Sequence, residues 1–217
     1  MDPREIPVYS TVEAARLVCV PPTSLRSWVG SDLIQMPRVS GHSRPALSFS
    51  NLVEAHVLTA IRRRHLVPLE RIRKALRFMR ERLGVPRPLI TEKFKTDGVD
   101  LFVEYAGDLV NVSRSGQLEM RELIETYLAR VDWDAEGIAA RLYPLTRADA
   151  AVEQPRLIVI DPRRGFGRPV LAGTGVPVEA IASRYRAGDS IDALALDFCV
   201  PREMIEDALR LGYRPAA

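Results

Sequence analysis

Two short helical patterns, interrupted by the stretch Cys19-Val20-Pro21-Pro22, constrain the N-terminal fold more than any other feature of the chain. The first pattern opens with Ser10 and Glu13, a capping box in which the serine side chain accepts the amide of Glu13. The prolines then break the helix, because proline has no backbone N–H to donate. The second pattern places three apolar residues on one helical face: Leu25, Trp28 and Val29. We therefore predict two short helices joined by a tight turn.

The polar residues of the second helix fall opposite its apolar face. They are Thr23, Ser24, Arg26 and Ser27, and no carboxylate accompanies them. Residues 1–88 carry 15 Lys and Arg against 7 Asp and Glu, a net charge of +8, whereas residues 89–217 carry 16 against 21, a net charge of −5. Because DNA binding relies on basic residues that contact phosphates, this asymmetry favours a DNA-binding N-terminal part. The alternative is a pair of short helices in an ordinary helical bundle.

A small β-hairpin, or wing, is predicted after these helices. Residues 33–49 contain two short apolar pieces around a Gly-His-Ser turn at 41–43, and Arg38 and Arg44 flank that turn. In the DNA-binding hypothesis the second helix enters the major groove, where the guanidinium of Arg26 matches the two acceptors of a guanine edge. Thr23 and Ser24 then hold a phosphate at the N-terminus of this helix, and Arg38 and Arg44 contact the flanking DNA backbone or minor groove.

Two longer helices are expected after the wing. Ser50 is predicted to cap a helix that runs to about Leu66. Pro68 opens a second helix, whose apolar residues recur at spacings of three and four, and Gly84 ends it. These helices complete a first predicted domain, residues 1–88.

The middle part of the chain has a different pattern. Between 89 and 150, apolar and polar residues alternate around Asp97-Gly98 and Gly107-Asp108, which predicts a β-meander. A helix near 117–131 follows it. The polar, alanine-rich stretch 146–155 predicts a linker to a separate C-terminal domain, residues 155–217.

The C-terminal domain is predicted to contain one strand and three helices. The strand is the apolar run at 157–160, and the helices are expected at about 177–187, from Asp189 or Ser190 onward, and at 202–211. The turns of both end regions contain the same Cys-Val-Pro triplet. The acidic residues of the last helix make it a poor reader of the major groove, so packing or dimerisation is its expected role.

The glycine-rich stretch GFGRPVLAGTGVP, residues 165–177, raises the question of a phosphate-binding loop. Such a loop needs Gly-Lys-Ser/Thr after it, and a dinucleotide turn needs a third glycine that opens directly into a helix. Arg168 and Pro169 stand here instead, and proline removes a backbone donor. We predict an extended strand, a turn at Gly173-Thr174-Gly175 and a helix with Pro177 at its first position. A nucleotide-binding enzyme is kept as a further alternative.

Residues that could carry catalysis or hold a metal are scattered. His42, His56 and His65 have no partner at metal-ligand spacing, and no Ser-His-Asp set is evident. Cys19 and Cys199 lie far apart, which favours a reduced, cytoplasmic protein. The first residues form no apolar signal region, and no apolar run approaches the length of a membrane span. We expect no catalytic site, no metal, no cofactor and no membrane partner.

Two stretches resemble known families. YSTVEAARLVCVPPTSLRSWV, residues 9–29, together with VPLERIRKAL at 67–76, resembles the MerR-like winged helix-turn-helix. Cys19 stands where that turn often has glycine, and Pro21 replaces the usual hydroxyl N-cap of the recognition helix. VIDPRRGFGRPVLAGTGVPVEAIASRYRAGDSIDALALDFCVPREMIEDALR closely resembles the small C-terminal domain of VapB-type bacterial antitoxins, although Gly175 stands where that pattern usually has arginine.

The second resemblance implies a partner. Antitoxins of this type bind and silence a toxin with a PIN-type fold, a metal-dependent ribonuclease with clustered carboxylates, and carry no catalytic residue themselves. Arginines on an exposed turn could pair with such an acidic pocket. The implied toxin contacts are Arg163, Arg164, Phe166 and Arg168.

The predicted protein is thus α+β and mostly α: a winged helix-turn-helix, a middle β-meander plus helix, and a small strand and three-helix domain. Its predicted function is that of an antitoxin that neutralises a PIN-type ribonuclease and represses its own operon. A homodimer on operator DNA is expected, because one short recognition helix rarely gives enough affinity alone. The alternative is a free-standing MerR-like transcriptional regulator whose middle domain senses a small molecule.

Overall fold

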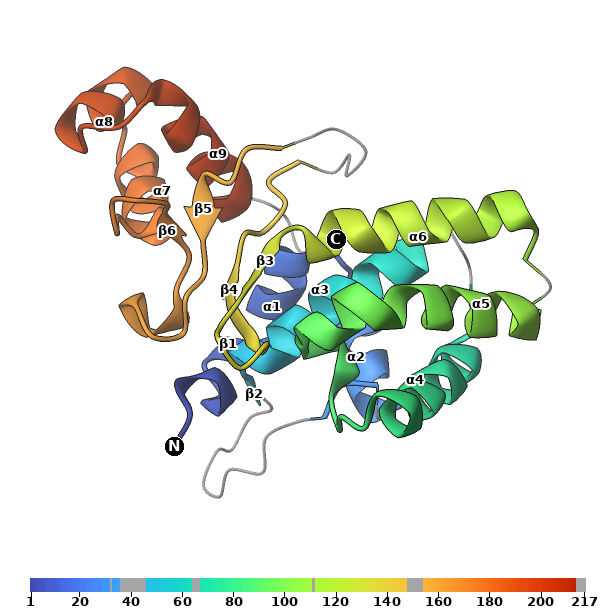
Figure 1. Cartoon of the computed structure of the whole chain (residues 1–217). Coiled ribbons are helices and arrows are strands. Elements are labelled where there is room, and N and C mark those ends of the chain that lie inside the picture. The colour runs from blue at the N-terminus through green and yellow to red at the C-terminus, as the bar shows by residue number, and fades with distance from the viewer. Residues whose placement is uncertain (32, 36–45, 64–66, 111, 148–153, 214–217) are drawn as a thin grey trace.

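The computed structural model describes residues 1–31, 33–35, 46–63, 67–110, 112–147 and 154–213, and it is α+β and mostly helical (Figure 1). The N-terminal elements are η1 (Pro3–Glu5), β1 (Tyr9–Ser10), α1 (Thr11–Val18), α2 (Pro22–Gly30), β2 (Ala46–Leu47), α3 (Phe49–Arg63) and α4 (Leu69–Leu83). Next come η2 (Pro88–Ile90), the π-helix η3 (Phe94–Gly98), α5 (Val99–Val110), α6 (Arg114–Leu128), β3 (Val131–Trp133) and β4 (Ala139–Leu142). The last are β5 (Ile158–Val159), η4 (Gly165–Gly167), β6 (Val170–Leu171), α7 (Val178–Arg186), α8 (Ile191–Asp197) and α9 (Arg202–Gly212).

The two short N-terminal helices are confirmed as α1 and α2. Ser10 is the N-cap of α1, and its hydroxyl accepts the Glu13 amide at 3.2 Å. Cys19 ends α1 in the left-handed conformation, with a φ of 61°, at the position that often holds glycine. Pro21 is the N-cap of α2 and offers no side-chain hydrogen bond. The capping box is only half formed, because the Glu13 carboxylate forms an ion pair with Arg168 instead.

Helix α3 is the centre of the helical body. Its side chains are buried from Phe49 to Ile61, on every face, as is typical of a helix enclosed by others. It packs against α6, α1 and η2, so the segments 1–88 and 89–150 contribute to one hydrophobic core. The predicted cap was misplaced, because Ser48 and not Ser50 accepts the Asn51 amide, at 3.3 Å. Helix α4 has the predicted limits, with Pro68 as its N-cap and Gly84 as its C-cap.

The predicted β-meander after residue 89 is wrong, because residues 94–110 form η3 and α5. Helix α5 packs against α4 and α6, with Val99, Phe102, Val103 and Ala106 buried at helical spacing. Gly98 and Gly107, which the sequence suggested as turn residues, lie inside η3 and α5 and allow neighbouring side chains to pack closely. A Cβ on Gly98 would lie 2.8 Å from the Phe94 ring, and one on Gly107 would lie 2.6 Å from the Gln117 side chain.

The predicted helix at 117–131 is observed as α6, which begins and ends three residues earlier. Val131 is buried as expected, but it lies in β3, which forms a hairpin with β4. This hairpin connects the helical body to the C-terminal unit. The amide of Leu142 donates to the carbonyl of Ile160 at 3.0 Å, and the amide of Ile160 donates back at 2.8 Å.

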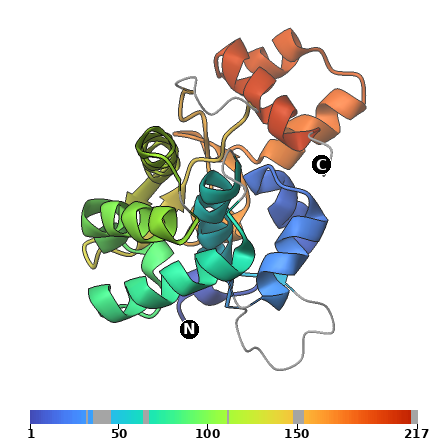
Figure 2. The same cartoon turned by 90° about the vertical axis from the view of Figure 1, so that its right-hand side faces the viewer.

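The C-terminal unit, residues 154–213, contains the antiparallel pair β5–β6 and helices α7, α8 and α9, at the positions the sequence predicts. It lies against α1, at one side of the helical body (Figures 1 and 2). Residues 148–153 of the predicted linker lie outside the described residues, but its ends are held in place. The Gln154 side chain accepts the amides of Thr146 and Arg147, both at 3.1 Å, and the Thr146 hydroxyl donates to buried Asp207 at 3.1 Å. No helix within the described parts is both long and apolar enough to cross a membrane.

Candidate interaction surfaces

The predicted DNA-reading face is the outer side of α2. Leu25 and Trp28 are buried, whereas Thr23, Arg26 and Ser27 are exposed and Ser24 is half-buried. The first turn of α2 contains no acidic residue. The N–H groups of a first turn have no acceptor within their helix, so they remain available to an anion. The arrangement is compatible with contacts to a phosphate and to a base edge, and these assignments stay predictions.

Of the predicted wing, residues 33–49, the structure describes only the two ends, 33–35 and 46–49. Strand β2 pairs antiparallel with β1, so that Tyr9 lies opposite Leu47. The tip of the predicted hairpin, with its arginines Arg38 and Arg44, lies outside the described residues. Two histidines considered as ligands, His42 and His65, also lie outside them.

The predicted toxin contacts form what we call the arginine loop, residues 163–168. Phe166 is 90% exposed, with a φ of 53°, between Gly165 at 55° and Gly167 at 73°. A non-glycine residue in the left-handed region costs roughly 1–2 kcal/mol, and a residue held in such a conformation is a reasonable marker of function. Arg163 and Arg164 are exposed beside it. The loop therefore presents one aromatic ring and two guanidinium groups to solvent.

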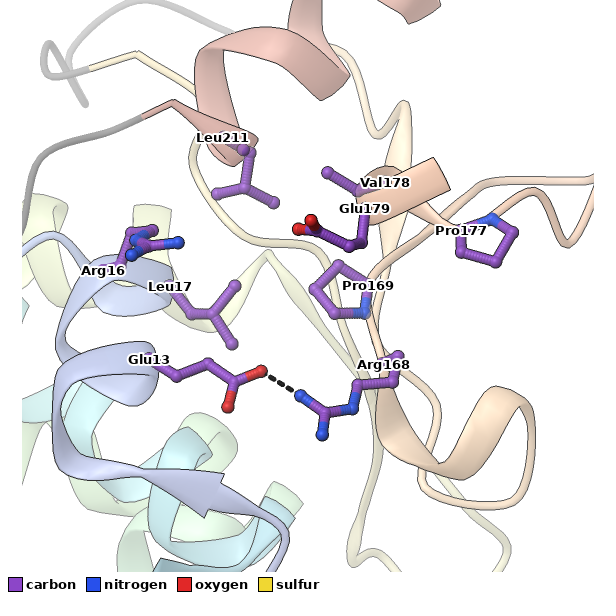
Figure 3. Close-up of a pocket in the computed structure, with 10 residues that line it drawn as sticks. Glu13, Arg16, Leu17, Arg168, Pro169, Pro177, Val178, Glu179 and Leu211 are labelled. Atoms are coloured by element: carbon purple, nitrogen blue, oxygen red, sulfur yellow. Dashed lines mark hydrogen bonds and ion pairs between the residues drawn. The ribbon is translucent and has the colours of Figure 1, made fainter. Parts of the chain in front are cut away.

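Two contacts hold the arginine loop against β1 and α1, and a third joins Arg163 to Asp134, beside the β3–β4 hairpin. Tyr9 is fully buried, and its hydroxyl donates to the carbonyl of Gly167 at 2.5 Å. Burial raises the pKa of the Tyr9 hydroxyl, which keeps it a donor. A Cβ on Gly167 would lie 2.7 Å from this hydroxyl, so glycine is required there. The second contact is the ion pair between Glu13 of α1 and Arg168 (Figure 3).

This second contact changes the interpretation of Arg168. The sequence suggested a free guanidinium on an exposed turn, but Arg168 is already paired within the chain. The four predicted residues do lie on one loop, where Arg164 and Phe166 are exposed and Arg163 Nη2 lies 3.8 Å from Asp134 Oδ2. Tyr9 and Glu13 were missed as partners, because nothing in the sequence relates residues 9–13 to a loop more than 150 residues later.

The glycine-rich turn does not offer a phosphate cradle. The amides of Thr174 and Gly175 both donate to the carbonyl of Leu171, each at 3.2 Å, and so are occupied within the chain. Gly175 has a φ of 78°, which explains glycine at this position, since a side chain would be strained there. The predicted helix start was off by one residue, because Pro177 is the N-cap of α7.

The last helix pair, α8 and α9, has the shape of a helix-turn-helix with its charges paired internally. Arg202 contacts both Asp192 and Glu206, and Arg210 contacts both Glu206 and the buried Asp207. Helix α9 packs against α7 and α8. Its contacts within the chain support the predicted packing role.

Metal-ligating side chains do not cluster within the described parts of the chain. Among the described residues, no three His, Cys, Asp or Glu side chains gather in a way that could hold a metal ion. His56 is fully buried in α3, where its Nε2 lies 3.0 Å from the Tyr127 carbonyl and its ring stacks at a tilt on Tyr127. Burial lowers the pKa of His56 to about 4, so the ring is neutral at pH 7.

The fold is that of an α+β, mostly helical protein, in which a short helix pair on a helical body packs against a small unit of one antiparallel strand pair and three helices (Figure 1). Residues 158–211 of that unit match the protein family described as "Protein of unknown function (DUF433)". The crystal structure of Rv2018 from Mycobacterium tuberculosis superposes with a TM-score of 0.75 at 30% sequence identity, and it covers 94% of this chain and 98% of that chain.

Two relatives from Mycobacterium tuberculosis match almost the whole chain. The protein named "Putative antitoxin VapB45" is 33% identical over 232 residues, which cover 94% of this chain and 93% of the relative. The protein named "Uncharacterized protein Rv2308" is 28% identical over 221 residues, which cover 95% of this chain and 89% of the relative. The chain therefore belongs to the family of VapB45.

Proposed function

We propose that this protein is the antitoxin of a toxin–antitoxin system. It binds and neutralises a PIN-type ribonuclease toxin through its C-terminal unit, and it represses its own operon by binding operator DNA through α2. Its role is binding and not catalysis. Membership of the VapB45 family supports the antitoxin role, and the exposed, strained Phe166 of the arginine loop is the observation that carries the toxin-binding part.

The arginine loop has the composition of an interface centre. Aromatic residues and arginine are enriched among the residues that dominate binding energy, and Phe166 stands between Arg164 and the Tyr9-anchored Gly167. Because the backbone already holds the ring outward, little conformational freedom is lost when a partner covers it. Arg164 can donate charge-assisted hydrogen bonds to clustered carboxylates of a ribonuclease, and Arg163 can join it by leaving its 3.8 Å ion pair with Asp134. Arg168 contributes less in this proposal, because it is engaged with Glu13.

The DNA-binding part is supported by the surface of α2 and by the charge of residues 1–88. That segment has a net charge of +8, and the outer face of α2 exposes Arg26 without a nearby carboxylate in the first turn. We further propose a homodimer, because a single helix of this length presents few base contacts and two half-sites multiply the specificity.

Co-expression tests the toxin-binding part. The chain is expressed with the product of an adjacent reading frame that encodes a small protein with several spaced Asp and Glu residues. We expect relief of growth arrest and co-purification of a complex. Phe166→Ala is expected to weaken that complex by about 2 kcal/mol or more, roughly 30-fold, because an exposed aromatic anchor is lost.

Leu196→Ala is the matched control, because Leu196 is also a large exposed apolar residue of the C-terminal unit but lies on α8, away from the arginine loop. It should leave the complex unchanged. Absence of any complex with the neighbouring product, and of any relief of growth arrest, would contradict the antitoxin proposal and favour the free-standing regulator. Equal effects of both substitutions would remove the arginine loop from the interface.

A further inference from the structure

A groove of about 450 Å³ lies where α1 meets the C-terminal unit (Figure 3). One side is formed by Glu13, Arg16 and Leu17 of α1. The other side is formed by Arg168 and the residue after it, the start of α7 and the end of α9. Pockets that bind small molecules have volumes of roughly 300–1,000 Å³ and often lie between two structural units. The groove meets both conditions, and among the proposed toxin and DNA contacts that the structure describes it contains only Arg168.

The groove has an apolar part that could receive an aliphatic group. Leu17, Val178 and Leu211 come from three different helices, and each is buried in the docked chain while still lining the groove. Figure 3 shows the side chains of Leu17 and Leu211 on either side of the space between α1 and α9. An aliphatic chain placed here would gain roughly 0.8 kcal/mol for each buried methylene.

The charged residues that line the groove differ in whether they form ion pairs among the described residues. Glu13 pairs with Arg168, and Glu179 pairs with Arg186. Arg16 has no ion pair among the described residues, and its Nε is buried without a hydrogen-bond partner. Burying an unsatisfied donor is unfavourable, more so when the group is charged. A ligand in the groove would supply the Arg16 guanidinium with the counter-charge that it lacks among the described residues.

A carboxylate is the ligand group that fits Arg16. The guanidinium presents paired donors that match the two oxygens of a carboxylate. Both acidic residues that line the groove are already paired with arginines, so neither of them calls for a cationic ligand. We propose that the groove binds a small molecule with one carboxylate on an aliphatic body, held by Arg16 at one end and by the three apolar side chains at the other.

Such a ligand would join the two units of the chain. Its carboxylate contacts α1, the first helix of the α1–α2 pair, while its aliphatic body contacts α7 and α9. It therefore binds the docked arrangement better than a separated one, and by mass action it stabilises that arrangement. The inference depends on the geometry of the groove alone, and it can be tested without a toxin or DNA.

Titration calorimetry of the full chain with octanoate tests the proposal. We expect octanoate to bind one site per chain and to raise the melting temperature. Octan-1-ol has the same body without the carboxylate and should bind at least tenfold more weakly. Arg16→Gln should weaken octanoate binding roughly 10- to 100-fold, because a charge-assisted hydrogen bond is lost, and Arg16→Lys should retain part of the affinity because the charge remains.

Arg77→Gln is the control, since it removes an exposed arginine of α4 outside the groove and should bind octanoate as the natural chain does. Melting curves without ligand show whether each variant is folded. The proposal is overturned if octanoate does not bind, if octan-1-ol binds as well, or if folded Arg16→Gln binds octanoate with unchanged affinity.

Discussion

Helix α1 is joined to α2 by Cys19-Val20-Pro21, and α8 is joined to α9 by Cys199-Val200-Pro201. The two cysteines have φ values of 61° and 52°, and the two prolines have ψ values of 139° and 144°. In both turns the valine amide donates at 3.0 Å to the carbonyl of an alanine five residues earlier. The same triplet thus produces the same backbone turn twice, once in the helical body and once in the C-terminal unit.

The helices after these turns differ in what they expose. Aligning the two triplets places Glu203 at the position of Thr23 and Glu206 at the position of Arg26. The apolar position between them is kept, because Leu25 and Ile205 are both fully buried. A shared backbone shape therefore does not make a shared binding surface. The charge on the exposed positions decides whether such a helix can approach a polyanion.

The largest expected difference between the two units is their response to acid. The last of the three histidines in the chain is His65, so the C-terminal unit has none, whereas the helical body buries His56. Burial lowers the pKa of His56 from 6.5 to about 4. The unfolded chain then binds a proton below pH 6.5 that the folded body does not bind. The free energy of unfolding should fall by about 3 kcal/mol as pH falls through this window.

Urea denaturation at several pH values between 7 and 4 checks this prediction. Trp28 and Trp133 both lie in the helical body, so their fluorescence follows the unit that contains His56. His56→Gln keeps a side-chain amide that can donate to the Tyr127 carbonyl but removes the titrating ring. A variant whose stability declines with acid as steeply as that of the natural chain would rule out His56 as the cause.

The next effect concerns the charge difference between α2 and α9. Arg26→Ala should weaken binding to a DNA fragment from upstream of the reading frame by about 1–3 kcal/mol, roughly 5- to 150-fold, because a base contact is lost. Arg26→Glu makes α2 resemble α9 at this position and should weaken binding further. Gel-shift titrations at fixed salt concentration measure both. Glu206→Gln in α9 is the control and should not change DNA affinity, and loss of binding in this variant would refute the distinction between the two helices.

The smallest expected effect concerns the cysteines of the two turns. Glycine adopts the left-handed conformation without the penalty of a side chain. Cys199→Gly should therefore stabilise the chain by about 0.5–1 kcal/mol, since Cys199 is exposed and loses little packing. Cys19→Gly should gain less, because the Cys19 thiol is partly buried and lies 3.7 Å from the Leu145 carbonyl. Melting temperatures of the two variants give the comparison, and a larger gain at Cys19 would contradict it.

Local signals in the sequence predicted most helices correctly, and one region incorrectly. Capping residues, prolines and glycines gave the limits of α1, α4 and α8 closely, because these residues act on the backbone beside them. The region around Gly98 and Gly107 was misread as a meander. Both glycines allow close contact with side chains from other parts of the fold, and a contact of that kind has no local signature.

The two candidate surfaces also differ in how much of each could be predicted from the sequence. The exposed face of α2 follows from helical spacing alone, so Arg26 and its neighbours could be found in the sequence. The sequence could locate the arginine loop, but it could not show which of its residues are already engaged within the chain. Its contacts through Gly167 and Arg168 are with Tyr9 and Glu13, which lie more than 150 residues away in the sequence and meet the loop only in the folded chain.

The sequence by itself determined the short helices, the two Cys-Val-Pro turns and the uneven charge of the two helix pairs, since these depend on residues close together in the chain. The tertiary structure alone decided that α3 is enclosed, that Arg168 is paired, and that Arg16 forms no ion pair within the described part of the chain. It also decided that a groove remains between α1 and α9. These features arise from contacts between residues far apart in the chain, and such contacts form only when apolar faces of separate elements are buried together.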